Sequence, residues 1–177
     1  MTYAKFASFA VLSAALATLA AEAEAAAERV AAHTDWTVFV SSDPKECYIV
    51  STPKSSVAKR DGKEAQVERG TINLFVRFNP SESVKNEVSF TGGYPFKPGN
   101  PVKLVVGSES FSLNPGPGDA SGWAWPAAAE DSRIVGSMRR GSSAVVTGVS
   151  SRGTTTIDTF SLSGFTAAVN EAESRCK

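Results

Sequence analysis

Short segments in which apolar and polar residues alternate recur through this sequence, separated by residues that favour turns. The clearest is 71–78, where every second side chain is apolar: Ile72, Leu74, Val76 and Phe78. A period of two places these side chains on one face of a β-strand and the intervening ones on the other face. Strands this short, closed by Gly, Pro, Asn or Asp, predict an antiparallel sheet whose inner face forms the core.

Most of the chain divides into such strands, and two segments have helical spacing instead. The expected strands are 36–40, 47–52, 71–78, 87–91, 102–106, 110–113, 123–125, 143–150 and 154–162. The expected helices are 127–140, which follows a proline and ends with two arginines, and 165–174, whose apolar residues recur at helical spacing. We therefore predict a mainly β fold: a β-sandwich or flattened barrel of about eight or nine short antiparallel strands with two short helices, one of them C-terminal.

The N-terminal segment has a different composition from the rest of the chain. Lys5 precedes an apolar, alanine-rich run at 6–21, and several Ala-x-Ala sites follow it. This is the pattern of a secretory signal peptide, and the run is short for a retained membrane anchor. We predict a signal peptide at 1–27, cleaved between about 21 and 27, then a flexible lead-in at 28–35 and a single β-rich domain at 36–177. The mature protein would then be periplasmic, attached to the cell envelope or secreted, with no transmembrane segment.

Cys47 and Cys176 are the two cysteines of the chain. Export to an oxidising compartment permits a disulfide between them. Cys176 falls on the apolar stripe of the expected C-terminal helix, or just beyond its end, so that helix would carry the thiol towards the sheet. We expect an intramolecular Cys47–Cys176 disulfide; two buried free thiols, or a bond between molecules, are the alternatives.

The sequence offers few groups for catalysis. Lys and Arg number 18 and Asp and Glu also number 18, so the chain lacks the net charge that attracts nucleic acid. Its single histidine, His33, precedes the first expected strand, which disfavours a nucleophile–histidine arrangement or a zinc site. We predict a protein that is not an enzyme and has no catalytic residues, metal or cofactor. A hydrolase that uses two carboxylates is the less favoured alternative.

Aromatic residues in loop-like segments are the best candidates for binding. Tyr94, Phe96, Trp123 and Trp125 lie close to Pro and Gly residues, and loops carry much of the binding function of proteins. Arg152 lies in the turn between the last two expected strands. These five residues are the candidate binding surface, although large aromatic residues more often fill a core or cap the end of a sandwich.

Several of these segments resemble the invasion-associated locus B proteins, a virulence-associated family of exported proteins of Gram-negative bacteria. The resembling residues are Trp36-Thr37-Val38, Gly93-Tyr94-Pro95-Phe96-Lys97-Pro98-Gly99, Trp123-Ala124-Trp125 and the run from Ser150-Ser151-Arg152-Gly153-Thr154 to Gly164-Phe165-Thr166-Ala167-Ala168. They are spread over about 36–176. The resemblance implies an exported, non-enzymatic protein of the envelope or the cell exterior, with no catalytic residues to transfer.

Two functions from different classes remain. The first is a binding module that contacts an unknown protein or envelope component of the host or of the bacterium itself through its exposed loops. The second is an envelope structural or chaperone-like protein, which would need an exposed sheet edge able to accept an added strand.

Overall fold

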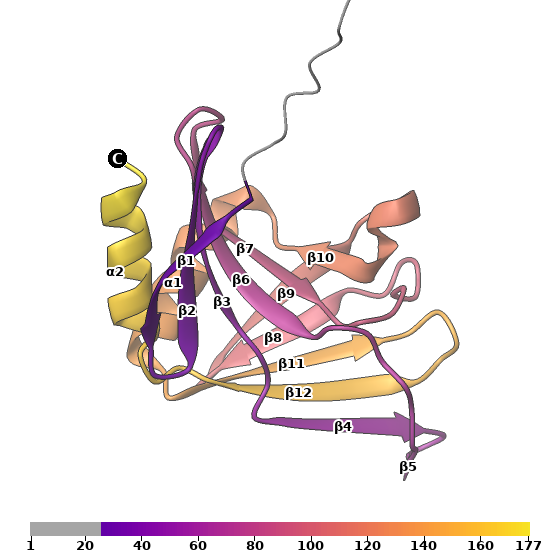
Figure 1. Ribbon diagram of the computed structural model, residues 1–177. Coiled ribbons are helices and arrows are strands. Elements are labelled where there is room, and N and C mark those ends of the chain that lie inside the picture. The colour runs from indigo at the N-terminus through magenta and orange to yellow at the C-terminus, as the bar shows by residue number, and fades with distance from the viewer. Residues whose placement is uncertain (1–25) are drawn as a thin grey trace, which may run out of the picture.

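The computed structural model describes residues 26–177 (Figure 1). The predicted signal peptide and its cleavage region lie almost entirely outside the described residues, so both stay predictions. Within 26–177, neither helix is long and apolar enough to cross a membrane.

The described residues form twelve strands and two α-helices. The strands are β1 (Glu28–His33), β2 (Trp36–Ser42), β3 (Lys45–Ser51), β4 (Ser55–Arg60), β5 (Lys63–Glu64), β6 (Asn73–Asn79), β7 (Val84–Thr91), β8 (Val102–Val106), β9 (Glu109–Pro115), β10 (Trp123–Trp125), β11 (Ser143–Val149) and β12 (Thr155–Ser161). The helices are α1 (Asp131–Arg140) and α2 (Phe165–Arg175), and short 3-10 turns cover Gly118–Gly122 and Ala128–Glu130.

All twelve strands belong to one antiparallel sheet with the order β1-β2-β3-β6-β7-β10-β9-β8-β11-β12-β4-β5. The short strand β10 joins the two halves, because it pairs with β7 on one side and with β9 on the other. In Figure 1 the strands of the first half (β1, β2, β3, β6 and β7) run across those of the second half (β8, β9, β11, β12, β4 and β5). The sheet is thus folded over on itself, which agrees with the predicted mainly β class.

The inner faces of the two halves make the core. Phe90 of β7 packs edge-to-face on Phe160 of β12, with ring centroids 6.1 Å apart. The indole N–H of Trp36 in β2 donates to the carbonyl oxygen of Ser161 at 3.0 Å. Leu74 and Val76 are fully buried, as the alternation in 71–78 predicted. Such interdigitation of two inner faces is how a folded sheet removes its apolar side chains from water.

All nine expected strands are present, and the structure adds β1, β4 and β5. The sequence 28–35 is therefore not a flexible lead-in: β1 pairs with β2, and His33 hydrogen-bonds to Glu171 of α2. Strand β4 lies near one edge of the sheet and pairs through its backbone with β12. The side chains of β1 and β4 are exposed or partly exposed. Neither strand therefore shows the alternation of apolar and polar residues that identified the other strands.

The two helices lie close to where they were expected, and both pack on the inner face of the first half. Helix α2 packs on β2 and β3, and Phe165 contacts Trp36 with ring centroids 4.9 Å apart. Immediately after α2, Cys176 forms the expected disulfide with Cys47 of β3, with the Cα atoms 5.8 Å apart. The disulfide prediction is therefore confirmed, and the disulfide fixes the C-terminal end of α2 to β3.

Helix α1 is attached to β7 through a buried carboxylate. Asp131, the first residue of α1, is 6% exposed and accepts a hydrogen bond from the backbone N–H of Val88 at 2.9 Å. Burial raises the pKa of Asp131 to about 6, although the Val88 N–H acts in the opposite direction. A carboxylate in this position is costly to ionise, because its charge is removed from water.

We predict that the disulfide contributes much of the free energy of unfolding. It closes a loop with a sequence separation of 129 residues, for which loop entropy gives about 4–5 kcal/mol as an upper value. Urea denaturation should show a loss of this order in the double variant C47S/C176S and in the reduced wild-type protein. Thiol titration verifies that the reduced protein is fully reduced. A urea midpoint that does not change on reduction would contradict the prediction.

We predict that Asp131 makes the protein less stable as the pH rises from 4 to above 6. The pKa of Asp131 is higher in the folded state than the ordinary value of 3.8. The protonated side chain therefore adds to the free energy of unfolding in full below pH 3.8, and this stabilisation is lost as the pH rises past 6. Asp131→Asn keeps the acceptor for Val88 but does not ionise. Urea denaturation should find D131N more stable than wild type at pH 7.5, by about 1 kcal/mol, and equal to it at pH 4. The same difference at both pH values would rule out ionisation as the cause.

Candidate functional site

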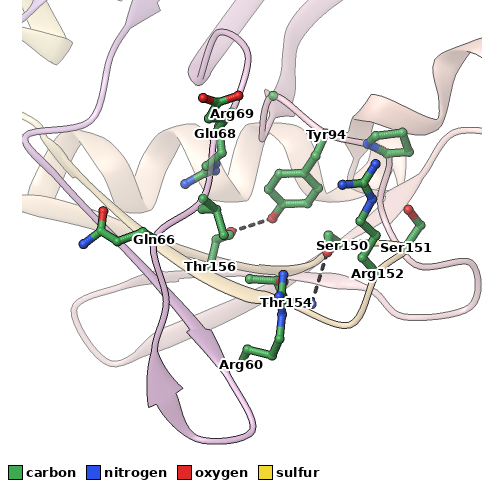
Figure 2. Close-up of a pocket in the computed structure, with 13 residues that line it drawn as sticks. Arg60, Gln66, Glu68, Arg69, Tyr94, Ser150, Ser151, Arg152, Thr154 and Thr156 are labelled. Carbon is green, nitrogen blue, oxygen red and sulfur yellow. Dashed lines mark hydrogen bonds between the residues drawn. The ribbon is translucent and has the colours of Figure 1, made fainter.

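A polar cleft of about 530 Å³ opens where three connections meet at one end of the folded sheet. Its walls come from the end of β4, the segment 66–69 that leads to β6, the loop 93–95 after β7 and the hairpin between β11 and β12. Figure 2 shows Tyr94, Arg152 and Arg60 around a set of hydroxyl groups. We call this cavity the arginine cleft, after Arg60, Arg69 and Arg152 in its lining.

One of the three arginines is part of a buried ion pair. Arg69 donates from Nη1 and Nη2 to the two carboxylate oxygens of Asp158 in β12, each at 2.7 Å. The Asp158 side chain is fully buried and that of Arg69 is 9% exposed. Arg69 Nε also donates to the carbonyl oxygen of Gly92 at 2.9 Å. This two-point contact neutralises Arg69 and joins three segments behind the cleft.

Tyr94 forms one wall and is held on several sides. Its hydroxyl hydrogen-bonds to Oγ1 of Thr156 (Figure 2). The Arg69 guanidinium lies over its ring, 5.1 Å from the centroid, and Phe96 packs edge-on at 5.1 Å. Burial raises the pKa of the Tyr94 phenol, so the side chain presents a neutral hydroxyl and one ring edge to the cleft at ordinary pH.

The loop before Tyr94 requires glycine. Gly93 has a φ of +73°, and a Cβ atom there would lie 2.5 Å from the carbonyl oxygen of Gly70. The two backbones approach so closely because the N–H of Gly70 donates to the carbonyl oxygen of Gly93 at 2.9 Å. This contact fixes the position from which Tyr94 projects.

The β11–β12 hairpin presents Arg152 at the mouth of the cleft. The Ser150 N–H donates to the carbonyl oxygen of Thr154 at 2.9 Å, and the Thr154 N–H donates to Oγ of Ser150 at 3.1 Å. The Ser151 N–H donates to the carbonyl oxygen of Pro95 at 2.9 Å, which ties the hairpin to the Tyr94 loop. A turn with this many internal bonds holds its backbone rigid while its central side chain stays free.

Two arginines of the cleft lack a carboxylate partner among residues 26–177. Arg60 donates from Nε and Nη2 to the hydroxyl of Thr154, at 3.3 and 3.0 Å. Arg152 is exposed and makes no hydrogen bond or ion pair with any residue of the described range. Glu68 is the acidic residue in the lining, and Figure 2 shows its carboxylate at the rim, turned away from the hydroxyl groups. The cleft therefore has guanidinium groups available for an anionic group.

The five residues expected to form one binding surface are divided among three places. Tyr94 and Arg152 line the arginine cleft. Phe96 is 2% exposed and packs on Phe90 at 6.0 Å between ring centroids, so it belongs to the core and not to a surface. Trp123 is 36% exposed, and Trp125 stacks beside it at 6.1 Å.

The two tryptophans lie on the outer face of the first half, at the end of a chain of five aromatic rings. We call this chain the aromatic row: Phe39, Tyr48, Phe75, Trp123 and Trp125, with successive ring centroids 5.1, 6.1, 5.4 and 6.1 Å apart. Sequence reasoning missed its first three members. Phe75 could have been identified from the sequence, because it is an aromatic residue at an outward position of the alternating segment 71–78.

The other functional candidates of the cleft could not be found from the sequence. Arg69 and Asp158 are 89 positions apart, and Arg60 and Thr154 are 94 apart. Asp158 is fully buried, and no local sequence pattern marks it as such. No group of three or more His, Cys, Asp or Glu side chains within 26–177 is placed to hold a metal ion.

Comparison with known protein families now adds one finding. Residues 122–173 match the family model of the invasion associated locus B (IalB) protein. The match confirms the family resemblance over this segment, which runs from β10 to α2 and contains Trp123, Arg152 and Thr156. Searches of the curated proteins and of the solved structures each gave no match.

We predict that breaking the Arg69–Asp158 pair is far more costly than breaking an exposed one. Asp158→Asn and Arg69→Met each leave a buried charge uncompensated, and each should lower the free energy of unfolding by about 3–5 kcal/mol. Lys85→Met removes the exposed Lys85–Glu173 pair and should cost at most about 1 kcal/mol. Urea denaturation of the three variants tests the difference. Equal losses in all three would show that the buried pair has no special role.

Proposed function

We propose that this chain is an exported, non-enzymatic binding protein that recognises an anionic group of an envelope or host component in the arginine cleft. The anionic group is a carboxylate, a phosphate or a sulfate, since guanidinium and hydroxyl donors suit all three. No catalytic residue is included in the proposal.

The single observation behind it is the pair of uncompensated guanidinium groups in one cavity. Arg60 and Arg152 have no acidic partner in the described chain, whereas Arg69 beside them is fully paired with Asp158. Hydroxyl groups of Thr154 and Thr156 also line the cavity. A cavity that gathers positively charged hydrogen-bond donors without a carboxylate to neutralise them is typical of a site for a negatively charged ligand.

The family resemblance supports the same location. The Gly93-Tyr94-Pro95 and Ser150-to-Thr154 segments, which carry part of the resemblance, both contribute to the lining of the cleft. The second of them also falls inside the segment that matches the IalB family. Export is supported by this family match and by the Cys47–Cys176 disulfide, because disulfides persist in oxidising compartments.

The strand-accepting alternative has less support. The sheet ends at β1 and β5. β5 has only two residues, and β1 carries a bulge between Arg29 and Ala31. Short and bulged edge strands are the devices by which proteins prevent the addition of a further strand.

A hydrolase with two free carboxylates also has less support. Asp158 is held by Arg69. The three glutamates that gather on the outer face of the first half, Glu46, Glu82 and Glu87, are each ion-paired with Arg77. Each of these carboxylates is already bound to a guanidinium group, so none of them is a free carboxylate.

We predict that the exported protein binds small anions in the cleft. NMR or calorimetric titration with inorganic phosphate, sulfate and glucuronate should detect binding of at least one, and the affinity should fall as salt is added. Arg152→Ala and Arg60→Ala should each weaken it by about tenfold, since a hydrogen bond to a charged group contributes about 1.5–3 kcal/mol.

Arg140→Ala is the matched control, because Arg140 is an exposed arginine far from the cleft whose nearest acidic partner is Glu109 at 3.4 Å. It should bind like the wild type. Failure of all three anions to bind, or equal binding by R152A and wild type, would overturn the proposal.

A further inference from the structure

The aromatic row is a second surface that the proposed function does not use. It crosses the first half from β2 through β3 and β6 to β10, always on the outer face. Both helices pack on the opposite face: Cys176 after α2 is bonded to Cys47, and Ile134 of α1 lies in the core. Neither helix therefore covers the row.

The need to fill the core does not explain why aromatic residues occupy these outward positions. The outward side chains of a half-solvated antiparallel sheet are usually polar. Here Trp123 is 36% exposed, and the other four rings are partly exposed and lie in contact along the row. A row of aromatic rings on the solvent-facing side of a sheet, one of them exposed and the others partly exposed, is typical of a binding surface.

Hydrogen-bonding groups border the row on both sides. On one side, Tyr48, Phe75 and Trp123 form the floor of a recess of about 180 Å³ whose other walls include Glu46 and Arg77. On the other side, a recess of about 460 Å³ is bounded by Trp123, Asn73 and Thr91, among others. A ligand lying along the row would meet ring faces beneath it and polar groups at its edges.

Charge and shape narrow the choice of ligand. Arg77 is paired with Glu46 at 2.7 Å, with Glu87 at 2.9 Å and with Glu82 at 3.2 Å, so the border of the row carries excess negative charge. Nucleic acid and anionic membranes are repelled by such a border. A globular protein partner would need a broad patch of about 800 Å², whereas the row is one ring wide and flanked by charges.

We propose that the aromatic row binds a linear glycan built of neutral sugars. The faces of aromatic rings carry negative potential, and the C–H groups on one face of a pyranose ring are weakly positive, so sugar rings stack on them. The sugar hydroxyls at the edges then reach carboxylate, guanidinium and amide groups such as those of Glu46, Arg77 and Asn73. An extended chain of sugar rings matches a strip of protein rings in a way that a compact ligand does not.

The glycan site is adjacent to the arginine cleft but independent of it. Tyr94 and Pro95 line both the cleft and the larger recess beside Trp123. Arg152 and Arg60 line only the cleft among these cavities. Variants of Arg152 therefore separate the two proposals.

The test is a titration of the exported protein with soluble hexasaccharides of glucose, xylose and N-acetylglucosamine, followed by NMR and tryptophan fluorescence. At least one should bind and perturb the signals of Trp123. Trp123→Ala should weaken binding by about tenfold or more, while Trp123→Phe, which keeps a ring, should retain most of it. Arg152→Ala should bind the glycan like wild type, and thermal unfolding should confirm that W123A is folded.

Four results would overturn the proposal. The first is that no hexasaccharide binds at millimolar concentration. The second is that W123A binds as well as wild type. The third is that R152A loses glycan binding, which would move the site to the cleft. The fourth is that sedimentation shows a dimer which W123A abolishes, since the row would then be covered by a second copy of the chain.

Discussion

The bidentate contact between Arg69 and Asp158 links the parts of the structure on which the cleft depends. Arg69 precedes β6 in the first half of the sheet, and Asp158 belongs to β12 in the second half. Through Nε, Arg69 also holds the end of β7 at Gly92. Because both charges are removed from water, each needs the other, and the two halves are fixed at one relative position. Tyr94 is held between this pair and Thr156, so the wall of the cleft is set by the same contact.

The two faces of the first half have separate roles. The inner face carries the core side chains, the disulfide at Cys47 and the contacts of both helices. The outer face carries the aromatic row and the Arg77 cluster. One strand serves both: β6 sends Leu74 and Val76 inwards and Phe75 and Arg77 outwards. Because successive side chains of a strand point to opposite faces, the seven residues of β6 can contribute to the core on one face and to a binding surface on the other.

The strands and helices with a clear pattern of apolar residues in the sequence were predicted correctly. The alternation in 71–78 identified β6 and its buried face, and helical spacing with terminal charges placed both helices. The helical position of Cys176 led to the correct disulfide. Strands β1, β4 and β5 were missed because their side chains are mostly polar, and their pairing is decided by the neighbouring strand. Phe96 was a candidate for the binding surface because of its proline-rich loop, but its side chain is buried in the core and its backbone forms an isolated bridge with Ser150.

The sequence by itself determined the β class, the short strands, the helix positions and the disulfide, because each depends on periodicity or on a pair with no competitor. Only the tertiary structure decided which polar residues meet. Arg60 and Thr154, or Arg69 and Asp158, are about ninety positions apart, and no local pattern relates them. The same holds for the aromatic row, whose rings come from four strands that are brought into register by the sheet. Binding surfaces of this kind result from strand order and folding of the sheet, which are properties of the whole chain and not of any segment.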